Sequence, residues 1–301
     1  MAVVRRVCIR YSQFIGNDYA NNMNNLDTLL YVEELLRSAG AIVRTYHDRP
    51  DTIDWKGAND PVTAADHAVN AYLVEHLAGA YPDDGILAEE SKDDLSRRQR
   101  SRVWCIDPLD GTKEFIARNG EFAIMVGLAV ESVARLGVVF QPIQDYMYSG
   151  ICDQGSWMTT PEGRRPLHVS DVDNPSDLRL VVSRSHRNPI TDDIKASLGL
   201  TQERISGSVG LKCGLIACAD ADLYLHPAPG TREWDTCAPE AILTGAGGKV
   251  TDCWGRPLRY SQPDVRRRRG LVASNSRCHG RVLSLMLPAL RAAGINPDQG
   301  W

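Results

Sequence analysis

The sequence has no apolar run near the roughly 20 residues that a membrane-spanning helix requires, so we expect no integral membrane segment. Its eight cysteines include no Cys-x-x-Cys pair, which excludes zinc-ribbon and thioredoxin-like sites. Several of them lie within apolar segments, where a free thiol packs as a small core side chain. This usage is typical of a reducing compartment, and we expect a cytoplasmic location.

A basic excess is also absent. The formal net charge is −4 over 301 residues, which argues against a protein that binds polymeric nucleic acid. The single basic block, residues 266–269, is predicted to be a solvated loop before a strand. The first 25 residues contain no long apolar segment followed by a cleavage site, so we interpret them as a lead-in rather than a signal peptide.

The patterns in residues 1–160 predict an α+β domain with an antiparallel sheet. Apolar residues recur at helical spacing over 26–47 and 63–81, with a polar loop at 48–61 between these helices. Short strands are predicted at 86–90 and 102–107. A meander of three strands is predicted at 121–131, 132–142 and 146–151.

A polar stretch at 153–175 is predicted to join this part to an α/β domain over residues 161–301. Strands are predicted at 179–185, 203–208, 222–227, 247–252 and 270–275. Helices are predicted from Pro189, over 210–220, from Trp234 and from about Gly280. Because strands and helices alternate, at least part of this sheet should be parallel.

Two aspartates, Asp107 and Asp110, follow a buried strand and flank Pro108 and Leu109. Proline fixes its own φ and keeps the preceding residue extended. Both carboxylates and the Leu109 carbonyl can then face one point. Oxygen donors of this kind suit a hard divalent cation.

Other residue types strengthen this interpretation. Gly111 and Thr112 open a short helical stretch, whose N–H groups can bind a phosphate. Glu89 and Glu90 end the preceding strand, and Asp235 begins a helix in the second part. Each acidic residue alone has a structural explanation, as a solvated strand end, an Asx-turn or a favourable charge at a helix N-terminus. Their combination indicates a metal and phosphate site.

Three segments resemble the signatures of the inositol monophosphatase superfamily, which contains magnesium-dependent, lithium-sensitive phosphomonoesterases. They are Glu89-Glu90-Ser91, the DPLDGT stretch at 107–112 and Trp234-Asp235, and PVTAAD at 61–66 resembles an early motif. Within the superfamily, DPLDGTKEFIARNGEF and WDTCAPEAIL resemble the 3′(2′),5′-bisphosphate nucleotidase branch, which cleaves 3′-phosphoadenosine 5′-phosphate to AMP. The resemblance covers residues 56–275. It implies the layered α-β-α-β-α sandwich of the inositol monophosphatase and fructose-1,6-bisphosphatase type, with the site between the two parts.

The resemblance also implies a role for each matching residue. Two or three Mg²⁺ ions would be bound by Glu89, Asp107, the Leu109 carbonyl, Asp110 and Asp235. Asp66 and Thr112 would form the catalytic pair that takes a proton from the attacking water, because a threonine hydroxyl alone is too weak a base. Glu90 would hold a water molecule on a metal ion, and the N–H groups of Gly111 and Thr112 would cradle the phosphate.

Substrate choice is expected to lie in the second part. By the same resemblance, the adenosine and 5′-phosphate of a nucleotide would be contacted by Ser183, His186, Ser208 and Lys212. Two of these residues also have a simpler interpretation, His186 as a surface residue at a strand end and Lys212 as a solvated helix residue. Ser208 stands where nucleotidases often have glycine. Members of the family often form dimers, and no dimer surface is visible in the sequence.

Three functions remain open from the residues. The first is a bisphosphate nucleotidase, with an adenine bisphosphate nucleotide as its small phosphorylated substrate. The second is a phosphatase of the same fold that acts on an inositol or sugar phosphate. The third is a binding protein that keeps the fold without catalysis. A missing carboxylate would indicate the third function, and none is missing.

Overall fold

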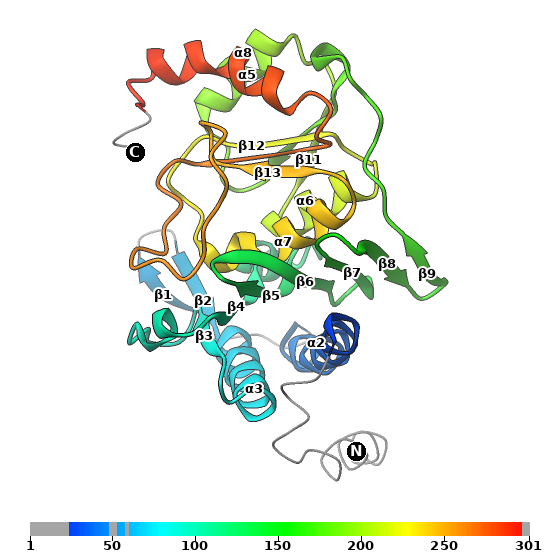
Figure 1. Ribbon diagram of the computed structural model, residues 1–301, viewed down its shortest axis with the longest axis vertical. Coiled ribbons are helices and arrows are strands. Elements are labelled where there is room, and N and C mark those ends of the chain that lie inside the picture. The colour runs from blue at the N-terminus through cyan, green and yellow to red at the C-terminus, as the bar shows by residue number, and fades with distance from the viewer. Residues whose placement is uncertain (1–23, 48–52, 58–59, 297–301) are drawn as a thin grey trace.

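The computed structural model describes residues 24–47, 53–57 and 60–296, which form five layers (Figure 1). Helices α2 (Asn25–His47) and α3 (Ala64–Ala80) form the first layer, against a seven-stranded sheet. Helices α6 (Val209–Ala217) and α7 (Glu233–Gly245) separate this sheet from a five-stranded sheet. Helices α5 (Pro189–Leu198) and α8 (His279–Ala292) form the last layer. The expected α-β-α-β-α sandwich is therefore confirmed, whereas the interpretation of the first 25 residues falls almost wholly outside the described residues.

The seven-stranded sheet follows the order of the chain, and only its first pair of strands is parallel. Its strands are β3 (Gly85–Ala88), β4 (Arg102–Asp110), β5 (Ala123–Val130), β6 (Val133–Gln141), β7 (Tyr146–Ile151), β8 (Gly155–Thr160) and β9 (Gly163–Pro166). Alternate residues of β5 pack into opposite cores, with Met125 facing α6 and α7 and Val126 facing α2 and α3. Because helices cover both faces, β5 is apolar throughout.

Two polar segments that were predicted as connections contain strands. Residues 153–175 include β8 and β9, and β9 is exposed along its whole length, so no apolar alternation marks it. The predicted loop at 48–61 includes β1 (Ile53–Gly57) and the start of β2 (Asp60–Thr63), which form an antiparallel hairpin. The predicted division after residue 160 falls between β8 and β9, and the two-domain division itself stays a prediction.

The five-stranded sheet has the order β11-β10-β12-β14-β13. Its strands are β10 (Leu180–Ser183), β11 (Glu203–Ser206), β12 (Leu223–His226), β13 (Lys249–Thr251) and β14 (Leu271–Ser274). Strand β10 is parallel to β11 and β12, and the other pairs are antiparallel. The prediction of a partly parallel sheet is confirmed. The carboxyl ends of β10, β11 and β12 therefore lie at one edge, where α/β sheets place their ligands.

Helix α7 lies directly on the seven-stranded sheet. Gly127 of β5 is paired in register with Gly137 of β6, which is paired with Gly150 of β7. A Cβ atom at Gly127 would lie 2.6 Å from the backbone nitrogen of Ala238, and one at Gly137 would lie 2.3 Å from the Ala238 carbonyl oxygen. A Cβ atom at Gly150 would lie 2.8 Å from the Cα of Ile242. This glycine row lets α7 approach the sheet more closely than any side chain would allow.

Three shorter helices complete the described chain: η1 (Ser96–Gln99), α4 (Thr112–Ile116) and η2 (Pro175–Asp177). The basic block at 266–269 is only partly the solvated loop that was predicted. Arg266 and Arg268 pair with Asp264 at the surface, but Arg267 is buried and donates to the Thr236 hydroxyl and the Arg259 carbonyl.

Seven cysteines lie within the described residues, and all seven are free thiols. In the same part of the chain, no helix has both the length and the apolar character needed to cross a membrane. The cytoplasmic location and the homodimer stay predictions.

Candidate active site

One pocket collects residues from both parts of the chain. The first part contributes a group from the ends of β3 and β4 and the start of α4, namely Glu89, Asp107, Leu109, Asp110, Gly111 and Thr112. The second part contributes Ser183, His186, Ser208, Lys212 and Asp235. All of these residues were predicted to belong to the site. Asp66 and Glu90 do not line the pocket.

The DPLD segment turns its polar groups inward at the end of β4. The pairing of β4 with β5 shifts register between Asp107 and Asp110, which makes room for Pro108 and Leu109. The backbone N–H of Leu109 donates to Asp107 Oδ1 at 2.9 Å and fixes this carboxylate. The segment is therefore a bulged strand end in which Asp107 makes the hydrogen bond of an Asx-turn.

The pocket concentrates negative charge in a place with little solvent. Burial, followed by the charges of Glu89, Asp110 and Asp235, raises the pKa of Asp107 well above its ordinary value. Burial and the charges of Glu89 and Asp110 have the same effect on the pKa of Asp235. Buried carboxylates that repel one another favour either protonation or a bound cation.

The chemistry of these donors fits a magnesium ion. Carboxylate and carbonyl oxygens are the protein ligands that this ion prefers. The four predicted carboxylate ligands and Leu109 line one pocket, together with a fifth carboxylate, that of Glu114. Within the described residues, no three acidic, histidine or cysteine side chains are gathered tightly enough to form a finished metal site by themselves. The assignment of ligands therefore rests on the donor set and stays a proposal.

Asp66 lies behind Thr112 and is held at the start of α3. Asp66 Oδ2 accepts hydrogen bonds from the backbone N–H and the hydroxyl of Thr63, at 2.8 and 2.6 Å. The first of these bonds is one half of the capping box of α3, whose other half is the Thr63 side chain accepting from the backbone of Asp66. The Thr112 hydroxyl lies 3.3 Å from Asp66 Oδ1 and 3.3 Å from the Leu109 carbonyl oxygen. The two predicted catalytic side chains are thus neighbours, with Asp66 oriented by the helix that it caps.

Asp110 contacts the second part of the chain. Its Oδ2 accepts hydrogen bonds from the Ser208 hydroxyl at 2.5 Å and the Gly210 N–H at 2.9 Å. Burial raises the pKa of Asp110, while the charge of Lys212 and these hydrogen bonds act in the opposite direction. The hydroxyl of Ser208 is therefore engaged with a predicted metal ligand, a contact that its sequence position did not suggest.

Lys212 is not a solvated helix residue. Its side chain is only 2% exposed, and Nζ donates to the carbonyls of Gly207 and Ser208 at 3.1 and 2.6 Å. Nζ also lies 5.1 Å from the centre of the Tyr224 ring. Burial lowers the pKa of Lys212, and the charge of Asp110 partly offsets this effect.

Several residues of the pocket were missed from the sequence. Lys113 Nζ lies 3.2 Å from His186 Nε2 at the pocket, and its position directly after the DGT motif was a signal for a role. His226 and Tyr224 lie near the carboxyl end of β12 and also line the pocket. The alternation of strands and helices could have indicated these two, because ligands bind at that edge of a parallel sheet.

Three comparisons with known proteins agree. A model of the inositol monophosphatase family matches residues 25–290. The 3′(2′),5′-bisphosphate nucleotidase CysQ of Escherichia coli strain K12 is 37% identical over 231 residues, which span 76% of this chain and 92% of that protein.

Among solved structures, CysQ from Bacteroides thetaiotaomicron is 30% identical, with a TM-score of 0.73 and coverage of 85% of this chain and 99% of that chain. The inositol monophosphatase from Anabaena is 28% identical, with a TM-score of 0.71 and coverage of 92% and 100%.

Proposed function

The chain belongs to the inositol monophosphatase family, and we propose that it hydrolyses the 3′-phosphate of 3′-phosphoadenosine 5′-phosphate, giving AMP and phosphate. The relatives named as 3′(2′),5′-bisphosphate nucleotidases support this substrate, since two of them match 76% of the chain at 37% and 35% identity. The proposal concerns a small nucleotide and does not involve polymeric nucleic acid.

The observation that carries the proposal is the presence of both acidic and basic side chains in one pocket. The acidic groups of Glu89, Asp107 and Asp235 lie on the same pocket as the cationic groups of Lys113 and Lys212. A bisphosphate nucleotide has two phosphates, of which only one reacts. The carboxylates suit the reacting phosphate with its cations, and the two lysines suit the phosphate that takes no part in the chemistry.

The magnesium ions would be held by Glu89, Asp107, the Leu109 carbonyl, Asp110 and Asp235, and we propose two or three of them. Bound Mg²⁺ lowers the pKa of water and neutralises charge on phosphoryl oxygens, which makes in-line displacement at phosphorus possible near neutral pH. Glu90 is half-buried in the turn after β3, where it would orient a water molecule beside this group.

The chain itself supplies the proton acceptor and the cradle for the phosphate. The Thr112 hydroxyl would take the proton of the attacking water and pass its own proton to Asp66, which already lies within contact distance. The backbone N–H groups of Gly111 and Thr112, at the turn from β4 into α4, would donate to the phosphoryl oxygens. Ser183, His186, Ser208 and Lys212 would hold the remainder of the nucleotide.

A substrate panel tests the proposal. Phosphate release would be measured with 3′-phosphoadenosine 5′-phosphate, inositol 1-phosphate and fructose 1,6-bisphosphate, on the wild type and on Thr112→Ala as the low-activity control. We expect the highest kcat/KM for the nucleotide. A preference for inositol or sugar phosphate would identify a phosphatase of the same fold with another substrate. No release from any of the three, with magnesium present, would favour a binding protein.

A further inference from the structure

Arg97 is a buried arginine outside the pocket. It belongs to η1, in the connection between Glu90 and the start of β4, and its side chain is only 1% exposed. Arginine is almost never buried to this extent unless its charge is paired. Its backbone and Cβ also pack against the first residue of β3, since a Cβ atom added at Gly85 would lie 2.8 Å from Arg97 Cβ.

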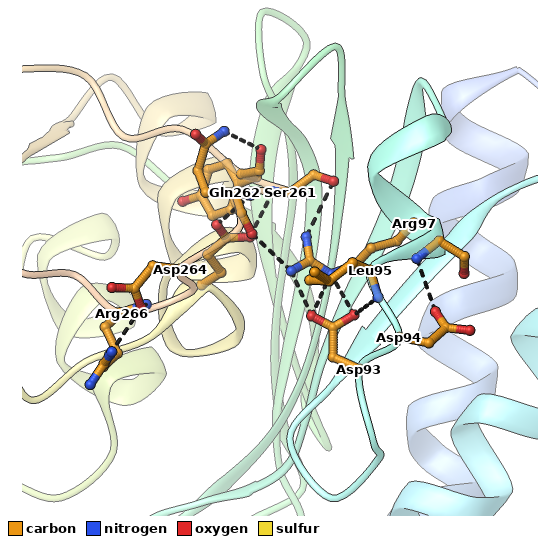
Figure 2. Close-up of polar contacts among 11 residues, drawn as sticks. Asp93, Asp94, Leu95, Arg97, Ser261, Gln262, Asp264 and Arg266 are labelled. Carbon is orange, nitrogen blue, oxygen red and sulfur yellow. Dashed lines mark hydrogen bonds and ion pairs between the residues drawn. The ribbon is translucent and has the colours of Figure 1, made fainter.

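The guanidinium of Arg97 joins two segments that are far apart in the sequence (Figure 2). On one side, Nε and Nη2 donate to the Asp93 carboxylate, with the shortest distance at 2.8 Å. On the other side, Nη2 donates to the Gln262 carbonyl at 2.9 Å and Nη1 to the Ser261 hydroxyl at 3.3 Å. The connection after β3 is therefore fastened to the segment before β14.

The segment of Ser261 and Gln262 is in turn held by Glu233. Both backbone N–H groups of this segment donate to the Glu233 carboxylate, at 2.6 and 2.9 Å. Glu233 is fully buried, and it is the first residue of α7, two positions before Asp235. Arg97 and Glu233 thus both hold the same short segment.

We propose that Arg97 and Glu233 are positioning residues, which together set the distance between the end of β3 with Glu89 and the start of α7 with Asp235. This inference rests on the proposed function, because it assigns these two acidic residues to one magnesium site. Glu89 and Asp235 come from different parts of the chain, so their separation depends on the contacts that fasten the parts together. The Arg97–Glu233 clamp, defined by Arg97, Glu233 and the backbone of 261–262, is a contact of this kind.

A clamp that only stabilised the fold would affect the melting temperature but not the affinity for magnesium. Loss of a purely structural ion pair lowers the melting temperature without changing the affinity for magnesium. Loss of a positioning contact also weakens metal binding, because residues that orient ligands typically contribute about 10- to 100-fold in affinity. The melting temperature as a function of magnesium concentration separates the two. A ligand that binds only the native state stabilises it by RT ln(1 + L/Kd), where L is the free ligand concentration, so a fit of this curve gives the magnesium concentration at half-saturation.

The test compares Arg97→Lys with Arg179→Lys as the matched control. Lysine keeps the charge but loses the planar fork that contacts two segments at once. Arg179 makes a comparable two-nitrogen contact with the buried carboxylate of Asp222, and neither residue lines the pocket. Melting would be followed with MgCl₂ alone over a range of concentrations, and kcat and KM would be measured on the nucleotide.

For Arg97→Lys we expect the half-saturating magnesium concentration to rise about tenfold, the lower end of the range for orienting residues. At subsaturating magnesium kcat should fall, while KM for the nucleotide at saturating magnesium changes little. Arg179→Lys should melt at a lower temperature with unchanged half-saturation. If Arg97→Lys does not fold, Asp93→Asn takes its place, since Asp93 is a partly exposed partner of Arg97. This variant should also raise the half-saturating magnesium concentration.

An unchanged half-saturation in Arg97→Lys, or in Asp93→Asn if that variant has to replace it, would show that the clamp only stabilises the fold. A wild-type protein whose melting does not respond to magnesium would overturn the proposed function and this inference together. A normal wild-type response with no effect of the variants would overturn the inference alone.

Discussion

The Ser208 hydroxyl donates a 2.5 Å hydrogen bond to Oδ2 of Asp110, and this bond connects the start of α6 to the end of β4. The same hydroxyl accepts from the Leu211 N–H and caps α6. Ser208 has a φ of 50°, a conformation that residues with a side chain rarely adopt. The hydroxyl thus offsets backbone strain at this position with two hydrogen bonds.

Ser208→Ala and Ser208→Gly should therefore differ in stability. Both lose the cap and the bond to Asp110, and the loss of a cap alone costs about 1 kcal/mol. Glycine also relieves a strain of about 1–3 kcal/mol, which alanine retains. In urea unfolding we expect Ser208→Ala to be the less stable variant. Equal unfolding free energies would mean that the strain at residue 208 is negligible.

Activity should require Mg²⁺ and should decrease with Li⁺. Asp110→Asn should abolish turnover and weaken magnesium binding while leaving the fold intact, because asparagine can still accept the bonds from Ser208 and Gly210. Circular dichroism and calorimetric titration with MgCl₂ would check both points. Asp171→Asn, at an exposed ion pair with Arg277, is the control and should behave as wild type. Full activity in excess chelator would contradict the metal requirement.

Lys212→Ala should reduce activity on every substrate, since it leaves two buried carbonyls without their donor and removes a positive charge beside Asp110. If Lys212 also binds the second phosphate, the loss should be larger on 3′-phosphoadenosine 5′-phosphate than on inositol 1-phosphate. A charge-assisted contact contributes about 1.5–3 kcal/mol, which corresponds to an excess loss of about 10- to 150-fold in kcat/KM. Equal losses on both substrates would confine Lys212 to a supporting role.

Stability should fall as the pH is lowered from 7 to 5. Burial, with a smaller effect of Lys249, lowers the pKa of His279 to about 4, whereas an unfolded histidine titrates near 6.5. Between these two pH values the unfolded chain binds more protons than the folded chain. The contribution of His279 to the free energy of unfolding is therefore complete above about pH 6.5 and is lost as the pH falls toward 4. We expect a loss of about 1–2 kcal/mol from this group at pH 5.

Urea unfolding at pH 7 and pH 5 would measure this difference. His279→Gln should show a smaller decrease than the wild type, because glutamine does not titrate. His67→Gln, at an exposed histidine, should retain the full decrease. A decrease of the same size in His279→Gln would assign the pH dependence to other groups.

The sequence predicted those elements whose apolar periodicity matches their burial. Helix α2 buries Leu29, Val32 and Leu36 on one face, and this spacing is plain in the sequence. Strand β9 has no buried residue, and β1 and β2 lie in a segment rich in charged and turn-forming residues. Such strands depend on pairing with a neighbouring strand, which a local pattern does not report.

Prediction of the site followed the same principle. The carboxylates could be predicted because Asp107 and Asp110 lie together in the short DPLDGT stretch, whose oxygen donors suit a divalent cation. The burial of Lys212 was missed, since it depends on Gly207, Ser208 and Tyr224 closing around Nζ in the folded chain. The contact of Arg97 with Ser261 was also inaccessible, because it joins residues 164 positions apart.

The position of Asp235 depends on the glycine row of Gly127, Gly137 and Gly150. Helix α7 carries Asp235 and packs on these three glycines. The distance of Asp235 from the sheet therefore depends on the absence of a Cβ atom at each of them. Mutation can alter most surface loops gradually, but the smallest possible addition here, a single methyl group, would lift the whole helix. A substitution at any of these three residues, none of which lines the pocket, would then move a predicted magnesium ligand.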